Sequence, residues 1–399
     1  MTHSACNVCH AELAEPIFRS AGRSSLTSLC EVRPEETVVR FCDHCGHTQT
    51  DELANAAEFY DQDYRILVDS DDEDQLYEVR NGERIFRLEH QTNVALQKVQ
   101  LPTDARVLDF GAAKAASLRK LMDRRSDLKP HVFDVSQMYQ SFWDRFIPKD
   151  QQACYTLPAD WTESFDLVTS WFVLEHVSNL NAALSDVLRA LKPGGSYLLT
   201  VPNVFANTAD FVVVDHVNHF SAASIRTLLQ QAGFVNVQID TEAYNAAFVV
   251  TAVKPESAER RVPISPSSQQ INETKAAISS TAEFWQSITD RIRCQEAGIP
   301  ADEPIAIYGA GFYGSYILTQ LQQPQRVQCL IDANKYLWNT ERFGTPVVGP
   351  KQLALDVRHV FAGLNPAAAR RIMAGIKDWQ SRRLNYLFLD DHTQQRSAA

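Results

Sequence analysis

The sequence predicts an α/β protein in which a small metal-binding module precedes two doubly wound α/β domains. Short apolar runs alternate with helix-like patterns over 106–253 and again over 304–389, which is typical of βα units and mainly parallel sheets. Two Cys-x-x-Cys pairs stand ahead of both stretches. The expected parts are a metal-binding module (1–57), a helical connector (58–101), a first α/β domain (102–254), a linker with a helix (255–300) and a second α/β domain (301–399).

Composition limits the class of protein and its partners. The 399 residues are 45% apolar and 22% charged, as in globular proteins that bury real cores. A net charge of −11 argues against nucleic acid as a partner, because affinity for phosphate backbones comes from Lys and Arg. Neither an apolar run of bilayer length nor a signal-peptide pattern is present, so we expect a cytoplasmic protein without a membrane partner.

The N-terminal cysteines predict a structural zinc site. Cys6 and Cys9 form one Cys-x-x-Cys pair and Cys42 and Cys45 the other, which supplies the four thiolates of a closed tetrahedral Zn²⁺ site. Free or disulfide-bonded cysteines are the alternative interpretation. Three nearby imidazoles could replace one thiolate, namely His10, His44 and His47.

The first α/β domain is predicted element by element. A mixed apolar stripe suggests a helix over 81–99, and Pro102 ends that pattern. Helical stripes of apolar residues occur over 184–191, before the breaker 192–195, and over 225–232. Strands are expected at 106–110, 131–134, 165–169, 196–201, 235–239 and 247–253.

The remainder of the chain is predicted in the same way. An acidic connector runs over 58–74, and a linker rich in proline and serine over 254–270. A helix over 271–294 leads into the second α/β domain. Its strands are expected at 304–308, 326–331, 357–361 and 385–389.

The order of motifs in the first α/β domain is specific. A strand ending at Gly111 is followed by an acid that ends the second strand, Asp134. Then come Val-Leu-Glu-His-Val (173–177), Leu-Lys-Pro-Gly-Gly (191–195) and Val-Pro-Asn (201–203). This order resembles the class I S-adenosylmethionine methyltransferases, whose cofactor lies beyond the carboxyl ends of the strands at the switch point. The resemblance implies cofactor contacts from Asp109, Gly111, Ala113, Asp134 (ribose hydroxyls), Asp160 and Trp161 (adenine).

The whole chain resembles a narrower family, the three-part nucleotide-sugar methyltransferases, which include C-methyltransferases of keto-deoxysugars. A cysteine-knuckle module, a methyltransferase domain and a Rossmann-like domain occur in this order, and segments 60–64, 201–203 and 215–221 fit the family's pattern. The resemblance implies a small-molecule sugar as the substrate, and a nucleotide-linked sugar is expected. Its implied contacts are Asn203, His219, Gly309, Gly311 and Gly314.

Two departures from the family pattern bear on activity. The cofactor loop reads Gly111-Ala112-Ala113-Lys114-Ala115, and an alanine forced to positive φ there would cost roughly 1–2 kcal/mol. The family's Tyr-x-Glu-His segment is Val213-Val214-Asp215-His216 here. The missing tyrosine leaves C-methylation, O-methylation and N-methylation open.

The candidate catalytic residues are chosen for proton transfer. Imidazole titrates near neutral pH, so His216 is the expected general base, oriented by Asp215 or a nearby acid. His176 could contact the acceptor or stabilise an enolate, although a purely structural role in its loop is an equal alternative. Tyr64 could hydrogen-bond to the sugar. A packing role for His219, and a metal site of Asp215, His216 and His219, are further alternatives.

Two rival functions remain open from the sequence. A degenerate methyltransferase that only binds a partner would explain the alanine-rich loop and the missing tyrosine. A nicotinamide-dependent enzyme would use the loop Gly309-x-Gly311-x-x-Gly314, which follows a strand and precedes Asp332 at the end of the next strand.

Overall fold

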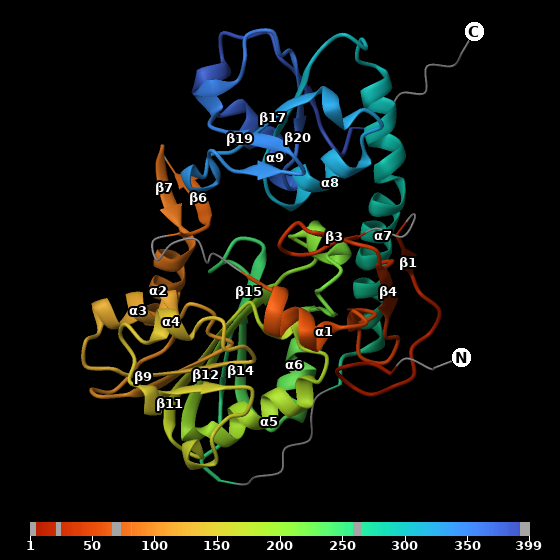
Figure 1. Cartoon of the computed structure of the whole chain (residues 1–399). Coiled ribbons are helices and arrows are strands. Elements are labelled where there is room, and N and C mark those ends of the chain that lie inside the picture. Colours follow the sequence, from red (N-terminus) through yellow and green to blue (C-terminus); the bar gives the residue numbers. More distant parts are fainter. Residues whose placement is uncertain (1–4, 21–24, 66–72, 81, 258–264, 392–399) are drawn as a thin grey trace. The chain divides into compact units, whose positions relative to one another are not determined.

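The computed structural model describes residues 5–20, 25–65, 73–80, 82–257 and 265–391. By its internal contacts the chain divides into two compact units (Figure 1). The first comprises residues 1–19 and 35–279, and the second residues 20–34 and 280–399. Within the described ranges, none of the helices combines the length and the apolar character that a membrane crossing requires.

The centre of the first unit is a seven-stranded sheet with the order β10-β9-β8-β11-β12-β15-β14. The first five strands in this order run parallel, and β15 is antiparallel to both of its neighbours. The chain reverses its direction of travel across the sheet between β8 and β11, which is the switch point where such sheets bind ligands. The strands are β8 (Arg106–Phe110), β9 (Lys129–Asp134), β10 (Gln152–Cys154), β11 (Phe165–Trp171), β12 (Leu191–Pro202), β14 (Val235–Asp240) and β15 (Ala247–Val253).

In the chain, the helices lie before, between and after the strands of this sheet. The longer ones are α2 (Arg87–Lys98), α3 (Ala116–Arg124), α5 (Leu180–Ala190), α6 (Ala222–Gln231) and α7 (Ser268–Ala297), the last of which continues into the second unit. The short ones are α1 (Ala56–Glu58), η1 (Phe59–Asp63), α4 (Gln140–Trp143), η2 (Lys149–Gln151), η3 (Ala159–Trp161), η4 (Leu174–His176) and η5 (Thr208–Val212).

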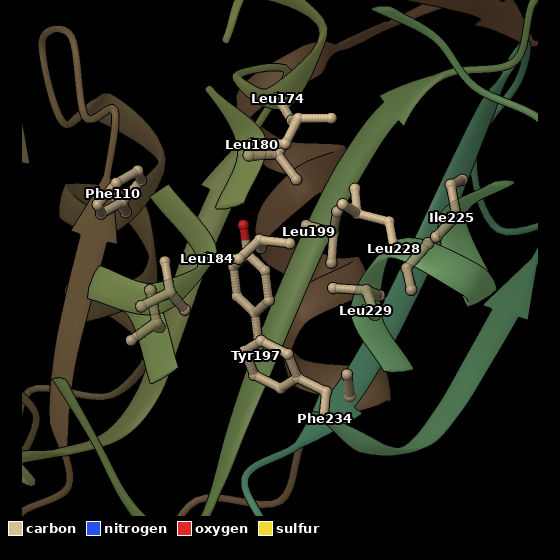
Figure 2. Close-up of a cluster of buried hydrophobic side chains, with 14 of the residues drawn as sticks. Phe110, Leu174, Leu180, Leu184, Tyr197, Leu199, Ile225, Leu228, Leu229 and Phe234 are labelled. Carbon is tan, nitrogen blue, oxygen red and sulfur yellow. The ribbon is translucent and has the colours of Figure 1, made fainter. Parts of the chain in front are cut away.

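Side-chain alternation along the strands divides the core into two layers. Successive side chains of a strand point to opposite faces, so Tyr197 and Leu199 of β12 share one face. Figure 2 shows these two side chains with Leu184 of α5 and with Leu228 and Leu229 of α6, all part of one buried cluster. The intervening residues of the strands belong to a second cluster together with residues of α2, α3 and α4.

The cysteine module adds a second, smaller sheet to this unit. Its order is β1-β4-β5-β13, and all of its pairings are antiparallel. The strands are β1 (Phe18–Arg19), β4 (Val38–Phe41), β5 (Thr48–Thr50) and β13 (Asn218–His219). Because β13 lies far along the chain from β5, the methyltransferase-like domain contributes one strand to the sheet of the cysteine module.

The prediction of a helix over 81–99 is wrong for the first part of that range. Residues Glu83–Phe86 form β7, which pairs with β6 (Leu76–Arg80) as a hairpin, and α2 begins only at Arg87. The carboxylate of Asp74 accepts from the backbone N–H of Leu88 at 3.3 Å, which satisfies one of the unpaired donors at this helix start. Asn81 lies outside the described residues.

The other differences concern element ends and short strands. Helix α7 begins at Ser268, inside the expected linker, where Ser267 Oγ accepts from Gln270 N at 3.3 Å. Residues 258–264 of that linker lie outside the described ranges, and so do Asp71 and Asp72 of the acidic run. Strand β12 starts at Leu191 and includes the expected breaker. Strands of two to four residues, such as β10, give no usable periodicity.

The second unit contains a six-stranded sheet with the order β18-β19-β17-β16-β20-β21. All of its pairings are parallel except that of β18 with β19, as expected for a Rossmann-like domain. The strands are β16 (Ile305–Tyr308), β17 (Val327–Ile331), β18 (Glu341–Arg342), β19 (Thr345–Val348), β20 (His359–Ala362) and β21 (Asn385–Leu387). The same unit holds β2 (Ser25–Leu26), β3 (Val32–Arg33), α8 (Phe312–Gln320), η6 (Pro324–Arg326), η7 (Lys335–Leu337), η8 (Pro350–Gln352), α9 (Pro366–Ala374) and η9 (Lys377–Trp379).

The buried cluster shown in Figure 2 leads to a prediction about stability. Leu184 is fully buried, so Leu184→Ala removes apolar contacts and leaves a cavity, at a cost of about 2–5 kcal/mol of unfolding free energy. Leu96 of α2 is 37% exposed, and Leu96→Ala should change that free energy by no more than about 0.5 kcal/mol. Urea unfolding of both variants checks this, and equal losses would contradict the assigned core.

Candidate functional site

The four cysteines of the two knuckles meet in one cluster. Cys6 Sγ lies 3.6 Å from Cys45 Sγ, and Cys9 Sγ lies 3.5 Å from Cys42 Sγ. All four sulfur atoms lie within 4.8 Å of one another, and none is in a disulfide. Zn–S bonds of about 2.3 Å in a tetrahedron place sulfurs about 3.8 Å apart, so the thiolates fit zinc. The cluster is a Cys₄ set, and the imidazoles of His10, His44 and His47 lie outside it.

The two knuckles have the same backbone geometry. The N–H of His10 donates to Cys6 O at 2.9 Å, and the N–H of Gly46 donates to Cys42 O at 2.9 Å. In both cases the residue that follows the second cysteine has a positive φ, 60° at His10 and 73° at Gly46. Each turn therefore presents two sulfurs on one side.

The loop after β8 is tied to the acid that ends β9. Asp134 Oδ2 accepts from Ala113 N at 2.8 Å, and Oδ1 accepts from Ser136 N at 3.2 Å. Burial raises the pKa of Asp134 to about 6. A carboxylate offers about four lone-pair sites, so hydroxyl donors can still bind. At the carboxyl edge beside the switch point, these residues fit S-adenosylmethionine: the loop would hold the methionine part and Asp134 the ribose.

The alanine-rich loop contains the backbone strain expected from its sequence. Ala113 has φ 45° and Ala115 has φ 54°, each costing roughly 1–2 kcal/mol. Gly111 has φ 76°, and a Cβ there would lie 2.5 Å from Val173 Cγ2. Val173 follows β11, so Gly111 is needed for close packing across the switch point.

The other expected cofactor residues lie in different places. Asp109 is buried in β8 and accepts from Thr169 Oγ1 at 2.8 Å; burial raises its pKa to about 7. Trp161 packs against His131 and Phe165, at the amino-terminal end of β11. The structure therefore does not bring Trp161, or Asp160 beside it, to the carboxyl edge where the cofactor loop lies.

A buried carboxylate holds two of the candidate histidines. Asp210 in η5 is fully buried, and it accepts from His216 Nδ1 at 2.6 Å and from His219 Nδ1 at 3.0 Å. Although burial opposes ionisation, His219 and His216 hold the pKa of Asp210 well below its usual range. Burial also opposes charge on His216, but the hydrogen bond and charge of Asp210 raise its pKa to about 9. The acid that orients His216 is therefore Asp210 and not Asp215.

His176 lies beside this pair in a contrasting environment. Its ring centroid is 4.7 Å from that of His216. Tyr60 donates its hydroxyl proton to Asp215 O at 2.8 Å, so its oxygen accepts from a protonated Nδ1 of His176 at 3.0 Å. This leaves Nε2 of His176 as an acceptor, 3.5 Å from Tyr64 Oη. Burial, with the nearby His216, lowers the pKa of His176 to about 4.

Glu175 completes the polar cluster. A carboxylate oxygen of Glu175 and ring nitrogens of His176 and His216 lie within 4.8 Å of one another. Burial raises the pKa of Glu175 to about 8, and its Oε2 has no hydrogen-bond partner among the described residues. The three residues that could hold a metal ion here are Glu175, His176 and His216, whereas the sequence suggested Asp215, His216 and His219.

The segment η1 links this histidine cluster to the cofactor edge. Tyr60 and Tyr64 contact His176, while Ser136 Oγ donates to the Asp61 carbonyl at 2.8 Å. Sequence reasoning selected Tyr64 but missed Asp210, Glu175 and Tyr60 as members of the cluster. Asp210 carried one available signal, because it is an acid placed directly before the apolar run 211–214 that leads to His216.

Asn203 and the glycines of the second unit have local structural roles. Asn203 Oδ1 accepts from Phe205 N at 3.1 Å in the turn after β12. A Cβ at Gly309 would lie 2.1 Å from Gly363 O, and one at Gly314 would lie 1.8 Å from Gly309 O, so close packing explains both glycines. A Cβ at Gly311 would meet nothing within 4 Å.

Comparisons with known proteins agree with this architecture. A family model described as a methyltransferase domain matches residues 82–239. The search of curated proteins gives no match. The match and the strand order together identify these residues as a class I, S-adenosylmethionine-dependent methyltransferase domain.

Similar solved structures cover about two-fifths of this chain. An S-adenosylmethionine-dependent methyltransferase from Mesorhizobium loti is 14% identical over 42% of this chain and all of its own, with a TM-score of 0.35. Human N-acetylserotonin methyltransferase is 17% identical over 41% of this chain and 52% of its own, with a TM-score of 0.35. Haemonchus contortus phosphoethanolamine N-methyltransferase 2 is 17% identical over 41% and 52%, with a TM-score of 0.34.

The cysteine cluster predicts about one zinc ion per chain. Cys45→Ser removes one of four thiolates, so we expect loss of the metal and a less stable N-terminal module. Cys294→Ser, at an exposed cysteine outside the cluster, should keep the metal. Elemental analysis and thermal unfolding check both, and wild-type protein that folds fully without metal would contradict a structural site.

The contact of Asp134 with the loop predicts its effect on cofactor binding. Asp134→Asn keeps the size of the side chain but loses a charged acceptor, so affinity for S-adenosylmethionine should fall by about 1.5–3 kcal/mol. Asp127→Asn, at a partly exposed ion pair with Arg125 (2.8 Å), is the matched control. Calorimetric titration measures both, and equal affinities for Asp134→Asn and wild type would argue against the assigned ribose contact.

Proposed function

We propose that this protein transfers the methyl group of S-adenosylmethionine to a sugar, with a nucleotide-linked deoxysugar as the expected acceptor and a histidine as the general base. The observation that carries the proposal is a pair of imidazoles whose ring centroids lie 4.7 Å apart, one of them bound to the buried carboxylate of Asp210. His176 has a pKa of about 4 and His216 one of about 9. Titratable pairs whose environments separate their pKa values are typical of acid–base centres.

The two shifts favour a division of roles. At neutral pH Nε2 of the neutral His176 ring is an acceptor, with Tyr64 Oη at 3.5 Å, whereas the charged ring of His216 can only donate. We therefore favour His176 as the group that takes the acceptor's proton, although the sequence pointed to His216. His216, paired with Asp210, would stabilise the negative charge that develops on an enolate or alkoxide.

The methyl group comes from the cofactor, and the protein contributes alignment and proton removal. S-adenosylmethionine supplies an electrophilic methyl group on its sulfonium. The packing of Gly111 against Val173, two residues before Glu175, keeps the cofactor loop close to the turn that holds His176. Tyr60 holds the ring of His176 through the hydrogen bond at Nδ1, and the ring of Tyr64 packs against it.

The sugar part of the proposal is supported by resemblance and by the polar aromatic groups of the cluster. Segments 60–64 and 215–221 fit the nucleotide-sugar methyltransferases. Val213 stands where that family has a tyrosine, but Tyr60 and Tyr64 bring phenol groups to the same histidine cluster. C-methylation beside a ketone and O-methylation both need the proton removal described above.

The proposal is tested by incubating the protein with methyl-labelled S-adenosylmethionine and a panel of nucleotide-linked keto- and hydroxy-sugars. We expect one sugar to gain one methyl group, seen by mass spectrometry. Methylation of a different acceptor class, with none of the sugars methylated, would overturn the substrate assignment. Absence of cofactor binding at millimolar concentration would instead favour a non-catalytic binding protein.

The division of roles predicts the pH profile of kcat/KM. The base works when deprotonated, above its pKa of about 4, and the donor when protonated, below its pKa of about 9. Activity should therefore be flat across neutral pH and fall above about pH 9. His176→Gln should lose about 10²–10⁴-fold in kcat, and His90→Gln, in α2, should not.

A profile that instead rises up to about pH 9 would assign the base to His216, because that ring must lose its proton before it can accept another. In that case His176→Gln would affect KM more than kcat.

A further inference from the structure

One side chain in β13 uses all of its hydrogen-bonding capacity. Asn218 is 1% exposed. Its Oδ1 accepts from Asn7 Nδ2 at 2.9 Å and from His47 Nε2 at 3.2 Å. Its Nδ2 donates to Leu174 O at 2.9 Å and to Val177 O at 2.7 Å. Because both carbonyls require a donor, the amide has only one possible orientation.

The four partners of Asn218 belong to the cysteine knuckles and to the turn that carries His176. Asn7 lies between Cys6 and Cys9, and His47 follows Cys45 by two residues. On the other side, the accepting carbonyls of Leu174 and Val177 flank Glu175 and His176. A single buried amide thus joins both knuckles to the backbone of this turn.

A second set of contacts joins the same module to His216. Strand β5 follows the second knuckle and pairs with β13, with Thr48 opposite His219. Thr50 Oγ1 lies 2.7 Å from His219 Nε2. His219 in turn donates to Asp210, the carboxylate that orients His216. Both histidines of the proposed centre are therefore connected to the metal-binding module.

We propose that the cysteine-bound metal determines the geometry of the two-histidine centre, with Asn218 as the positioning residue between them. The metal holds the two knuckles together, so Asn7 and His47 stay at hydrogen-bond distance of one amide oxygen. When the metal leaves, that oxygen loses its fixed donors and the turn of His176 is no longer held. The catalytic meaning rests on the proposed function, but the structural coupling can be measured without any acceptor.

The test is the set of histidine side-chain NMR signals, assigned with His176→Gln and His216→Gln. In Asn218→Asp an oxygen replaces the Nδ2 donor and repels the carbonyls of Leu174 and Val177. We expect the wild-type signals of His176 and His216 to shift while bound zinc is retained. Asn179→Asp is the matched control, because the Asn179 side chain accepts from Ala182 N at 3.1 Å and donates to none of the described residues, and Asp preserves that bond.

Two further measurements keep the proposal testable if Asn218→Asp does not fold. Asn7→Ala removes one donor from the other side of the amide and should shift the same signals. Removal of zinc from the wild-type protein by a chelator should also shift the signals of His176 and His216. Added Zn²⁺ should restore these signals, and circular dichroism should show that the domain stays folded throughout.

Once an acceptor is known, Asn218→Asp should lower kcat about 10²-fold and leave the KM for S-adenosylmethionine unchanged.

The outcomes separate the two proposals. Signals of His176 and His216 that stay unchanged after zinc removal in a folded protein, or in folded Asn218→Asp and Asn7→Ala, would overturn the coupling. Shifted signals in a protein that methylates no sugar would support the coupling and refute only the proposed substrate.

Discussion

The pairing of β5 with β13 is the contact on which the site depends. It makes a strand of the methyltransferase domain part of the sheet of the cysteine module, so the knuckles and the histidine-bearing segments belong to one structure. A strand pair this short is weak alone, and buried side-chain contacts must support it. Asn218 and the contact between Thr50 and His219 provide this support.

The buried charge of Asp210 gives the histidines their different properties. An unpaired carboxylate without solvent access is costly, so His216 is held protonated beside it. The next imidazole, His176, is then disfavoured as a cation by burial and by its charged neighbour. Burial together with one acid thus makes a donor and an acceptor of two chemically identical side chains, at the edge of the sheet where class I folds bind their cofactor.

Features with local signals could be predicted from the sequence. Strands β8 and β15 have the expected bounds because their apolar runs are bordered by clear turn residues, and the spacing of the cysteines was sufficient to predict their cluster. Features that depend on distant contacts could not. Nothing in the sequence distinguishes Asp210 from other acids next to apolar residues. Asn218 and His47 are hydrogen-bonded although 171 positions separate them in the sequence. The order of the motifs predicts Trp161 at the adenine, but its packing on Phe165 places it at the amino-terminal end of β11.

A crystal structure of the zinc-loaded protein with S-adenosylhomocysteine would show whether the cofactor and the two histidines share one site. We expect the ribose hydroxyls to bind Asp134 and the sulfur atom to lie next to His176 Nε2 and His216. A cofactor bound away from the carboxyl edge of β8 and β11, or a sulfur atom directed away from both histidines, would contradict this expectation.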